Sequence, residues 1–215
     1  MSIPEVAIID YGMGNLFSVY WAFKECGAAV SVTSDPDLIL SASHVILPGV
    51  GAFANGMKEL RQRGLDVVVR EVAARGIPML GIYLGMQMLL EESEEFCTTK
   101  GLGLIPGVVV PVPSTTTAGH PQKIPHIGWN DLVLPDKRNN WAGTLLQYVR
   151  PTEAVYFVHS FMANPIDGSH RIADCLYGGV PISAVIGHDN VFGCQFHPEK
   201  SGVVGLKVLG RFLML

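Results

Sequence analysis

The chain has 215 residues, of which 48% are apolar and 16% charged, and its formal net charge at pH 7 is -4. This balance is that of a globular protein, and the length suits one α/β domain, 1–215, with a sizeable core. It excludes the dense basic surface that nucleic acid requires, and no segment reaches the roughly 20 apolar residues that span a bilayer, so we expect a cytoplasmic protein with no nucleic-acid or membrane partner.

The first part of the chain alternates short apolar runs with amphipathic segments. Asn15 is placed to cap a helix whose apolar residues recur at i, i+3, i+4 and i+7, and Gly27 stands where a left-handed C-terminal residue belongs. This alternation predicts a mostly parallel central sheet with helices on both faces, and ligands bind such sheets outside the carboxyl ends of the strands. The expected elements are strands at 6–10, 30–33, 45–47 and 79–82, a short helix after Asp35-Pro36, and helices across 57–74.

After Gly101 the strands become shorter and Gly and Pro more frequent, which predicts a mixed or antiparallel extension of the sheet. The polar tract 113–119 is typical of a surface loop. Ser201 is placed to cap a last helix. The expected strands are 154–161, 171–176, 182–186 and 191–196.

The cysteines and histidines do not form a metal-binding pattern. The four cysteines, at 26, 97, 175 and 194, lie far apart without a CxxC pair, and the seven histidines lack the HExxH spacing. We expect reduced thiols, no metal site and no cofactor.

Segment 81–85, Gly-Ile-Tyr-Leu-Gly, lies between an expected strand and an expected helix. Small flanking residues permit a sharp turn that lifts one side chain to the helix N-terminus, where free N–H groups favour an anion. Taken alone the pattern is weak, because two glycines in an ordinary strand-to-helix turn would look the same.

His197 and Glu199 follow the last expected strand. A histidine there can act as a general base, and a neighbouring carboxylate can hold its tautomer and orientation. Alone, the pair is equally well explained as a capped strand end with a surface carboxylate.

The sharp turn at 81–85 will be called the elbow. Together and in this order, the elbow, the Met86-Gln87 pair after it and the segment His197-Pro198-Glu199 resemble the signature of class I glutamine amidotransferases. Three further segments, 10–15, 48–53 and 125–130, resemble the glutaminase subunits of imidazole glycerol phosphate synthases in histidine biosynthesis. The resemblance runs from Ile8 to Phe212. It implies one amidotransferase domain with a flavodoxin-like fold and glutamine as substrate.

The resemblance also implies roles for individual residues. Position 83 would be the nucleophile, His197 would shuttle the proton, and Glu199 would orient the His197 side chain. Backbone N–H groups near Val50 and at Leu84 would stabilise the oxyanion. The glutamine pocket would be lined by Gly51, Gln87, His159, Ser160 and Phe161.

In such enzymes the ammonia passes to a partner cyclase, a (β/α)₈ barrel that forms a heterodimer with the glutaminase subunit. The resemblance implies that four residues lie in segments that face or neighbour that interface: Trp129, Asn130, Tyr156 and Lys200. Each also has an ordinary explanation, since such aromatic residues are more often core or edge residues and a lysine is usually a solvated charge.

Tyr83 departs from the family pattern, which has cysteine there. A phenol has a pKa near 10 against about 8.5 for a thiol, and its oxygen lies about 4 Å farther from the backbone than a cysteine sulfur. The ring would also take room meant for the glutamine amide. We do not expect Cys194 to replace the nucleophile, because its offset of three from His197 along a strand points the two side chains to opposite faces. The chain is therefore predicted to be inactive or severely impaired as a glutaminase.

Two other functions stay open. The chain would also fit a non-catalytic paralogue that binds or regulates a barrel partner, or a glutaminase of a related pathway, including a sugar-amidating one. Three origins of Tyr83 stay open as well: a recent substitution, an inherited change in a paralogue, or a modified cysteine that is written as tyrosine.

Overall fold

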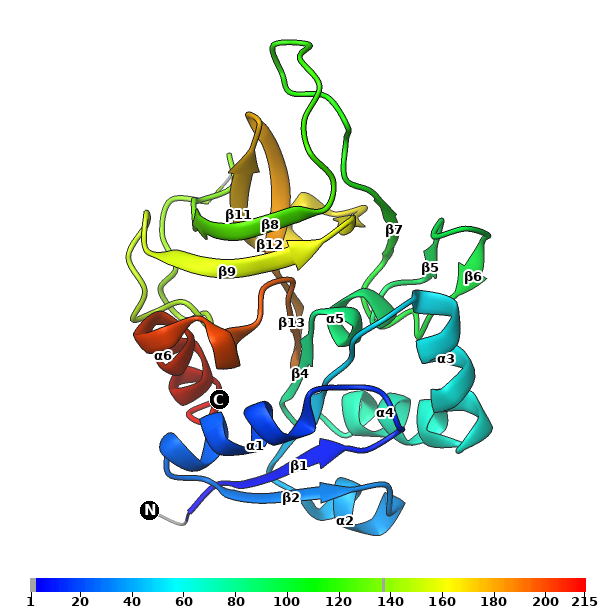
Figure 1. The fold of residues 1–215 in the computed structure, drawn as a ribbon. Helices are drawn as coiled ribbons and strands as arrows, with labels where there is room; N and C mark the ends of the chain where they lie inside the picture. The colour runs from blue at the N-terminus through cyan, green and yellow to red at the C-terminus, as the bar shows by residue number, and fades with distance from the viewer. Residues whose placement is uncertain (1–2, 137) are drawn as a thin grey trace.

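The computed structural model describes residues 3–136 and 138–215. Within these ranges the largest sheet has seven strands, in the order β11-β12-β13-β4-β3-β1-β2 (Figure 1). The strands from β2 to β13 pair in parallel, whereas β12 and β11 pair antiparallel, so the predicted sheet with its antiparallel extension is confirmed. The bounds are β1 Glu5–Ile9, β2 Ala29–Thr33, β3 His44–Leu47, β4 Met79–Ile82, β11 Arg171–Tyr177, β12 Val180–His188 and β13 Val191–Cys194.

Helices cover both faces of this sheet, as predicted (Figure 1). Side chains alternate across each strand, so in β1 Ile8 belongs to one apolar cluster and Ile9 to the other. One cluster includes α1 (Leu16–Glu25) and α6 (Gly202–Phe212). The other includes α2 (Pro36–Ser41), α3 (Phe53–Gln62), α4 (Leu65–Ala74) and α5 (Leu84–Met88).

The predicted helix boundaries near the N-terminus are confirmed. The Asn15 side chain accepts a hydrogen bond from the Ser18 N–H at 3.4 Å, and Gly27 has φ 85° after the end of α1. Asp35 caps α2 by accepting from the Asp37 N–H at 2.9 Å. These ends are set by local chemistry, which explains why the sequence predicts them.

One predicted strand is wrong. Range 154–161 forms two strands that break at Ser160: β9 (Ala154–His159) pairs with β8 (His126–Asp131), and β10 (Phe161–Pro165) pairs with β7 (Gly107–Pro111). Apolar alternation reports the two faces of a strand and not its neighbours, so it does not reveal that the chain passes from one sheet to another. The sheet that contains β10 and β7 also contains β5 (Glu92–Ser93) and β6 (Thr99–Lys100).

Ser201 precedes α6, but its side chain does not cap the helix, which corrects the expectation of a Ser201 cap. Its hydroxyl instead donates to the His197 carbonyl oxygen at 2.7 Å and accepts from the Tyr156 N–H at 3.1 Å. A short 3₁₀ helix, η2 (Pro198–Lys200), lies between β13 and α6, and another, η1 (Gly168–His170), precedes β11. The Ser201 hydroxyl is thus engaged by these two tertiary hydrogen bonds and not by the first turn of α6.

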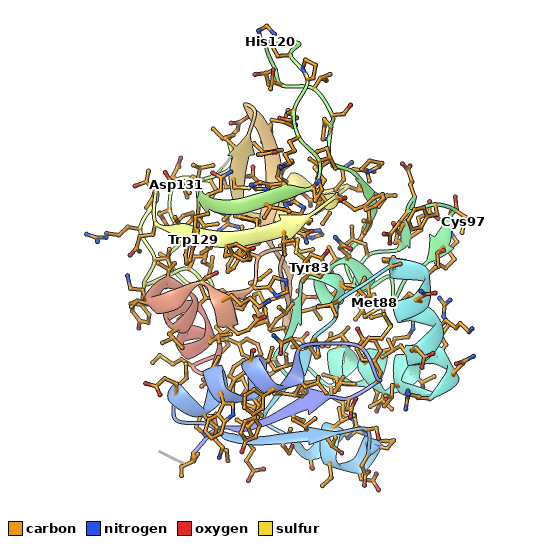
Figure 2. All side chains as sticks on the ribbon, in the orientation of Figure 1. Tyr83, Met88, Cys97, His120, Trp129 and Asp131 are labelled. Carbon is orange, nitrogen blue, oxygen red and sulfur yellow. The ribbon has the colours of Figure 1, made fainter. Side chains whose placement is uncertain are left out.

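The predicted surface loop, 113–119, leads to the exposed His120 at the outer end of a long projection (Figure 2). The Thr117 N–H donates to the Gly178 carbonyl oxygen at 2.9 Å and ties the loop to the turn between β11 and β12. In the part of the chain that the structure describes, no helix is both long and apolar enough to cross a membrane.

The contact between α5 and β3 leaves no room for a side chain at Gly85, because a Cβ there would overlap the Leu47 carbonyl oxygen. We expect Gly85→Ala to lower the free energy of unfolding by about 3 kcal/mol, since backbone must move to relieve the overlap. Urea unfolding measures this. Gly210→Ala is the matched control, because a Cβ in that part of α6 meets nothing within 4 Å, and we expect a gain of up to about 1 kcal/mol. Equal stability of the two variants would contradict the close packing.

Candidate active site

The turn at Tyr83 joins the end of β4 to the start of α5. Tyr83 has φ 56° and ψ -109°, a conformation that is rare for a bulky residue and costs on the order of 1 to 3 kcal/mol. Its N–H donates to the Cys194 carbonyl oxygen at 2.8 Å, and its own carbonyl oxygen accepts from the Gln87 N–H at 3.2 Å. A Cβ on Gly81 would lie 2.7 Å from the Gly85 carbonyl oxygen. The two glycines therefore make the strained turn possible, and the turn presents residue 83 at a helix N-terminus.

His197 and Glu199 form a buried pair beside this turn. The Nδ1 atom of His197 lies 2.8 Å from Oε1 of Glu199, and the two side chains are only 4% and 1% exposed. A proton on Nδ1 donates to the carboxylate and leaves Nε2 as a base. Ser201 holds the backbone of this segment through the His197 carbonyl oxygen, and α6 packs so closely that Gly205 has no room for a Cβ beside the Pro198 carbonyl oxygen.

The ring of Tyr83 stacks on the ring of His197, with centroids 5.0 Å apart and planes inclined by 21°. Burial raises the pKa of the Tyr83 phenol, and the negative charge of Glu95 raises it further. The phenol therefore stays protonated at neutral pH. Its ring covers one face of the His197 imidazole.

Cys194 is buried in the core at the end of β13. Burial raises the pKa of its thiol well above the usual range, and the nearby Glu199 carboxylate adds to the shift. A neutral, inaccessible thiol is a poor nucleophile. Cys194 is therefore unsuited to replace the residue at position 83, as expected, but because of its burial and not because of a strand offset, since β13 ends at Cys194.

Segment 48–51 lies against the start of α5. A Cβ on Gly49 would stand 3.0 Å from the Leu84 Cβ, and the buried Tyr11 hydroxyl donates to the Pro48 carbonyl oxygen at 2.8 Å. Val50 is 39% exposed and Gly51 has φ 102°. Leu84 begins α5, so its N–H has no acceptor within the helix. Both expected oxyanion segments therefore lie at the same end of the sheet as Tyr83.

Most of the expected glutamine-pocket residues meet at one backbone carbonyl. The Phe161 oxygen accepts from Gln87 Nε2 at 3.2 Å and lies 2.8 Å from Nδ1 of His159. The second Gln87 amide hydrogen points to Gln195 Oε1 at 3.1 Å. Gln87 and His159 are buried and share the Phe161 carbonyl oxygen as a partner, whereas Ser160 and Phe161 are half-buried.

Glu95 is a site residue that the sequence analysis missed. Its Oε2 atom accepts from the Phe53 N–H at the start of α3 at 2.6 Å, and its charge acts on the Tyr83 phenol. In the sequence it belongs to the acidic run 91–95, which is typical of a solvated surface. Only the folding of β5 back toward α3 shows that this carboxylate lies at the site.

The expected interface residues have different environments. Trp129 on β8 is 59% exposed and makes an edge contact with Tyr156 on β9, with ring centroids 6.1 Å apart (Figure 2). Trp129 is thus not a core residue, while Tyr156 is half-buried. Asn130 donates to the Leu176 carbonyl oxygen at 3.0 Å, and Lys200 is exposed directly after Glu199.

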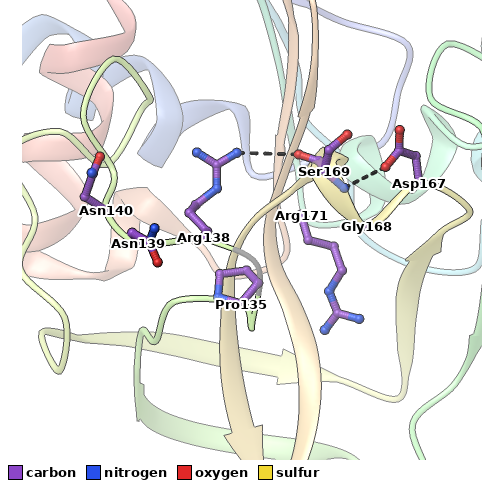
Figure 3. A pocket seen from close by; sticks show the side chains of 8 residues that line it. All are labelled: Pro135, Arg138, Asn139, Asn140, Asp167, Gly168, Ser169 and Arg171. Atoms are coloured by element: carbon purple, nitrogen blue, oxygen red, sulfur yellow. Dashed lines mark hydrogen bonds between the residues drawn. The ribbon is translucent and has the colours of Figure 1, made fainter.

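A separate cavity of about 550 Å³ shares no lining residue with this site (Figure 3). Arg138 reaches the Ser169 carbonyl oxygen there, and Arg171 is paired with Asp174 through Nη2 and Oδ2 at 2.9 Å. Among the described residues, no group of three or more His, Cys, Asp and Glu side chains is arranged to hold a metal ion.

The buried His159 makes stability depend on pH. Burial lowers its pKa from 6.5 to about 4, and the neighbouring His126 contributes in the same direction. Between these values the unfolded chain binds more protons than the folded chain, so the free energy of unfolding falls as the pH falls, by about 3 kcal/mol over the whole window.

We expect His159→Asn, which keeps a donor toward Phe161, to reduce the loss of stability between pH 7 and pH 4.5 by about 2 kcal/mol. Urea unfolding at the two pH values measures the difference. His120→Asn, at an exposed loop position, is the control and should leave the pH dependence unchanged. The same pH dependence in both variants would show that His159 is not buried in its neutral form.

Comparisons with known proteins agree with this geometry. Residues 7–214 match the family model described as glutamine amidotransferase class-I. The chain is 51% identical over 213 residues to imidazole glycerol phosphate synthase subunit HisH 1 of Legionella pneumophila (strain Lens), which covers 99% of this chain and 100% of that protein. It is 45% identical over 208 residues to the HisH subunit of Geobacillus thermodenitrificans (strain NG80-2), with 97% and 94% covered. A chain in the structure of PurLQS from Thermotoga maritima has the same fold, with a TM-score of 0.74, 21% identity and 99% of each chain covered.

Proposed function

Because this chain belongs to the class I glutamine amidotransferases, within the group of HisH subunits, we propose that it is the glutaminase subunit of an imidazole glycerol phosphate synthase whose hydrolytic step is blocked at residue 83. One observation carries the proposal. The buried His197–Glu199 pair, with Nδ1 and Oε1 2.8 Å apart, lies against the side chain of a strained elbow residue, and that side chain is a phenol.

With cysteine at position 83, the site has the groups for amide hydrolysis. Nε2 of His197 takes the thiol proton, the thiolate attacks the side-chain amide carbon of glutamine, and the Val50 and Leu84 N–H groups hold the oxyanion. The imidazolium then gives its proton to the leaving ammonia. A water molecule, deprotonated by His197, hydrolyses the thioester and releases glutamate. Glu199 keeps the proton of His197 on Nδ1 throughout.

Tyrosine at position 83 blocks this sequence at its first step. The phenol is neutral because its pKa is raised, and its ring covers the imidazole that would accept the proton. A water molecule attacking in the same oxyanion site would lack the covalent route, and loss of a catalytic nucleophile costs roughly 10⁶ in kcat. The chain as it stands therefore has negligible glutaminase activity.

The substrate needs groups for its charged end as well as for its amide. Glu95 supplies a carboxylate close enough to Tyr83 to affect the pKa of the phenol, which suits the α-ammonium group of glutamine. Gln87, fixed between Phe161 and Gln195, limits the depth of the pocket. Gly51 has φ 102°, and a Cβ there would lie 3.0 Å from Met13 Cε, so this position suits glycine.

We further propose that a cyclase barrel binds over β8, β9 and η2 and receives the ammonia, forming a heterodimer. Trp129 is a large aromatic side chain on an exposed strand, and such residues supply much of the binding energy in protein interfaces. Lys200 adds an exposed charge beside the catalytic pair. Tyr83 is not part of this surface over β8, β9 and η2, so a tyrosine at position 83 leaves the surface intact.

A second function is favoured by the stacked ring itself. Because Tyr83 fills the space beside His197, the chain would also serve as a non-catalytic subunit that binds the barrel and leaves it to use free ammonia. The two functions differ in whether the remaining groups still support hydrolysis.

Restoring the nucleophile separates them. We expect Tyr83→Cys, in complex with its cyclase and the cyclase ligand, to release ammonia from glutamine at least about 10⁴-fold faster than Tyr83→Ala, which removes the ring without supplying a thiol. A coupled glutamate assay measures the rate. If Tyr83→Cys forms the complex and releases no ammonia, the glutaminase proposal fails and the non-catalytic subunit remains.

The partner surface is tested independently of activity. We expect the unaltered chain to bind the cyclase, and Trp129→Ala to weaken the complex by at least about 30-fold, the loss typical of a buried interface aromatic. Calorimetric titration gives the Kd. Leu38→Ala is the matched control, because Leu38 is 53% exposed on α2, far from β8 in Figure 1. Equal loss in both variants, or none in either, would place the partner elsewhere.

A further inference from the structure

A continuous chain of hydrogen bonds runs inside the protein from β8 to α5. Asn130 Nδ2 lies 3.4 Å from His126 Nε2, and His126 Nδ1 lies 3.0 Å from His159 Nε2. His159 Nδ1 lies 2.8 Å from the Phe161 carbonyl oxygen, which also accepts from Gln87 Nε2 at 3.2 Å. Both histidines are almost fully buried, at 3% and 1% exposure. This row of hydrogen bonds therefore connects β8, the strand that carries Trp129, with α5, the helix that follows the elbow.

The direction of these bonds is fixed from both ends. At one end a carbonyl oxygen can only accept, so His159 carries its proton on Nδ1 and has an acceptor at Nε2. His126 must then donate from Nδ1 and accept at Nε2. At the other end the Asn130 oxygen accepts from the Asp131 N–H at 2.8 Å and its Nδ2 donates to the Leu176 carbonyl oxygen. The remaining Nδ2 hydrogen of Asn130 faces His126 Nε2, which must accept in this arrangement of hydrogen bonds.

The surroundings hold this arrangement rigidly. The His126 ring is stacked between Tyr177, with centroids 4.1 Å apart, and Phe157, with centroids 5.0 Å apart. The Tyr177 hydroxyl donates to the Lys123 carbonyl oxygen at 2.5 Å. Protonation of either imidazole would bring two donors face to face at one of the bonds, and burial already disfavours the charged forms. Only one hydrogen-bond pattern satisfies all of these groups.

We propose that His126 is a positioning residue of the glutamine pocket: through His159 it fixes the Phe161 carbonyl oxygen, which in turn holds the Gln87 side chain on α5. The Gln87 N–H donates to the carbonyl oxygen of residue 83, so the anchored side chain belongs to the first turn of the elbow helix. The effect on catalysis rests on the proposed glutaminase function, whereas the effect on Gln87 does not. His126 itself touches no substrate.

The first experiment uses the unaltered chain. Nitrogen-15 spectra of histidine-labelled protein should show Nδ1 protonated and Nε2 unprotonated in both His126 and His159 at neutral pH. A proton on Nε2 of either ring overturns the proposal, whatever the protein does with glutamine. Because no substitution is involved, this result does not depend on the stability of any variant.

Substitution then tests the coupling to Gln87. His126→Leu removes the donor to His159, and we expect the side-chain amide resonances of Gln87 to shift and their hydrogen exchange to accelerate by at least about tenfold. His126→Asn keeps a donor at the place of Nδ1 and should leave both unchanged. His120→Leu, on the exposed loop, is the control for any general effect of replacing a histidine by leucine. An unchanged Gln87 in His126→Leu, or equal changes in the Leu and Asn variants, overturns the proposal.

Kinetics in the Tyr83→Cys background add a separate readout. We expect His126→Leu to raise the KM for glutamine about tenfold with kcat within about twofold, and His126→Asn to restore the KM, because the pocket and not the chemistry is displaced. If Tyr83→Cys itself releases no ammonia, the proposed function fails while the spectra still decide the role of His126. A loss of kcat alone in His126→Leu overturns the positioning role.

Discussion

The close contact between the start of α5 and the end of β3 is the constraint on which the rest of the site depends. Gly85 fits against the Leu47 carbonyl oxygen only because it lacks a Cβ, and Gly81 allows the same helix to turn back over β4. Residue 83 is thereby forced to φ 56°, and the free N–H groups of α5 lie beside segment 48–51. The strain at one residue is held by the packing of two sheet strands and a helix, so it is not a local property of the turn.

A second set of contacts fixes the opposing wall of the site. The Tyr83 N–H is tied to Cys194 in β13, and three residues later His197 is held through its carbonyl oxygen by Ser201. The Ser201 hydroxyl also accepts a hydrogen bond from the Tyr156 N–H, so one hydroxyl joins β9 to the segment that carries His197 and Glu199. The Ser201 side chain therefore makes no capping bond to α6 and instead holds the backbone of His197, whose Nδ1 lies 2.8 Å from Oε1 of Glu199. The site is thus built where β4, β13 and β9 meet.

The backbone of Tyr83 is fully hydrogen-bonded, but its side chain occupies the space beside His197. The strained turn at residue 83 presents a ring that stacks on His197. Burial and Glu95 both keep the phenol protonated. The side chains of His197, Gln87 and His159 remain buried and hydrogen-bonded, and nothing in the fold explains why tyrosine stands at this position.

The sequence by itself determined the fold class and the element boundaries that local caps define, and it indicated the candidate residues of the site. Asn15, Gly27 and Asp35 act on their own neighbours, so their effects are visible in the amino-acid order. Residue 83, His197 and Glu199 lie in motifs at strand ends, and the structure places the rings of residue 83 and His197 together and pairs His197 with Glu199. The tertiary structure alone decided the break between β9 and β10, the use of Ser201, the approach of Glu95 and the chain from His126 to Gln87. These depend on which segments become neighbours, and apolar periodicity reports the faces of an element but carries no information about its partners.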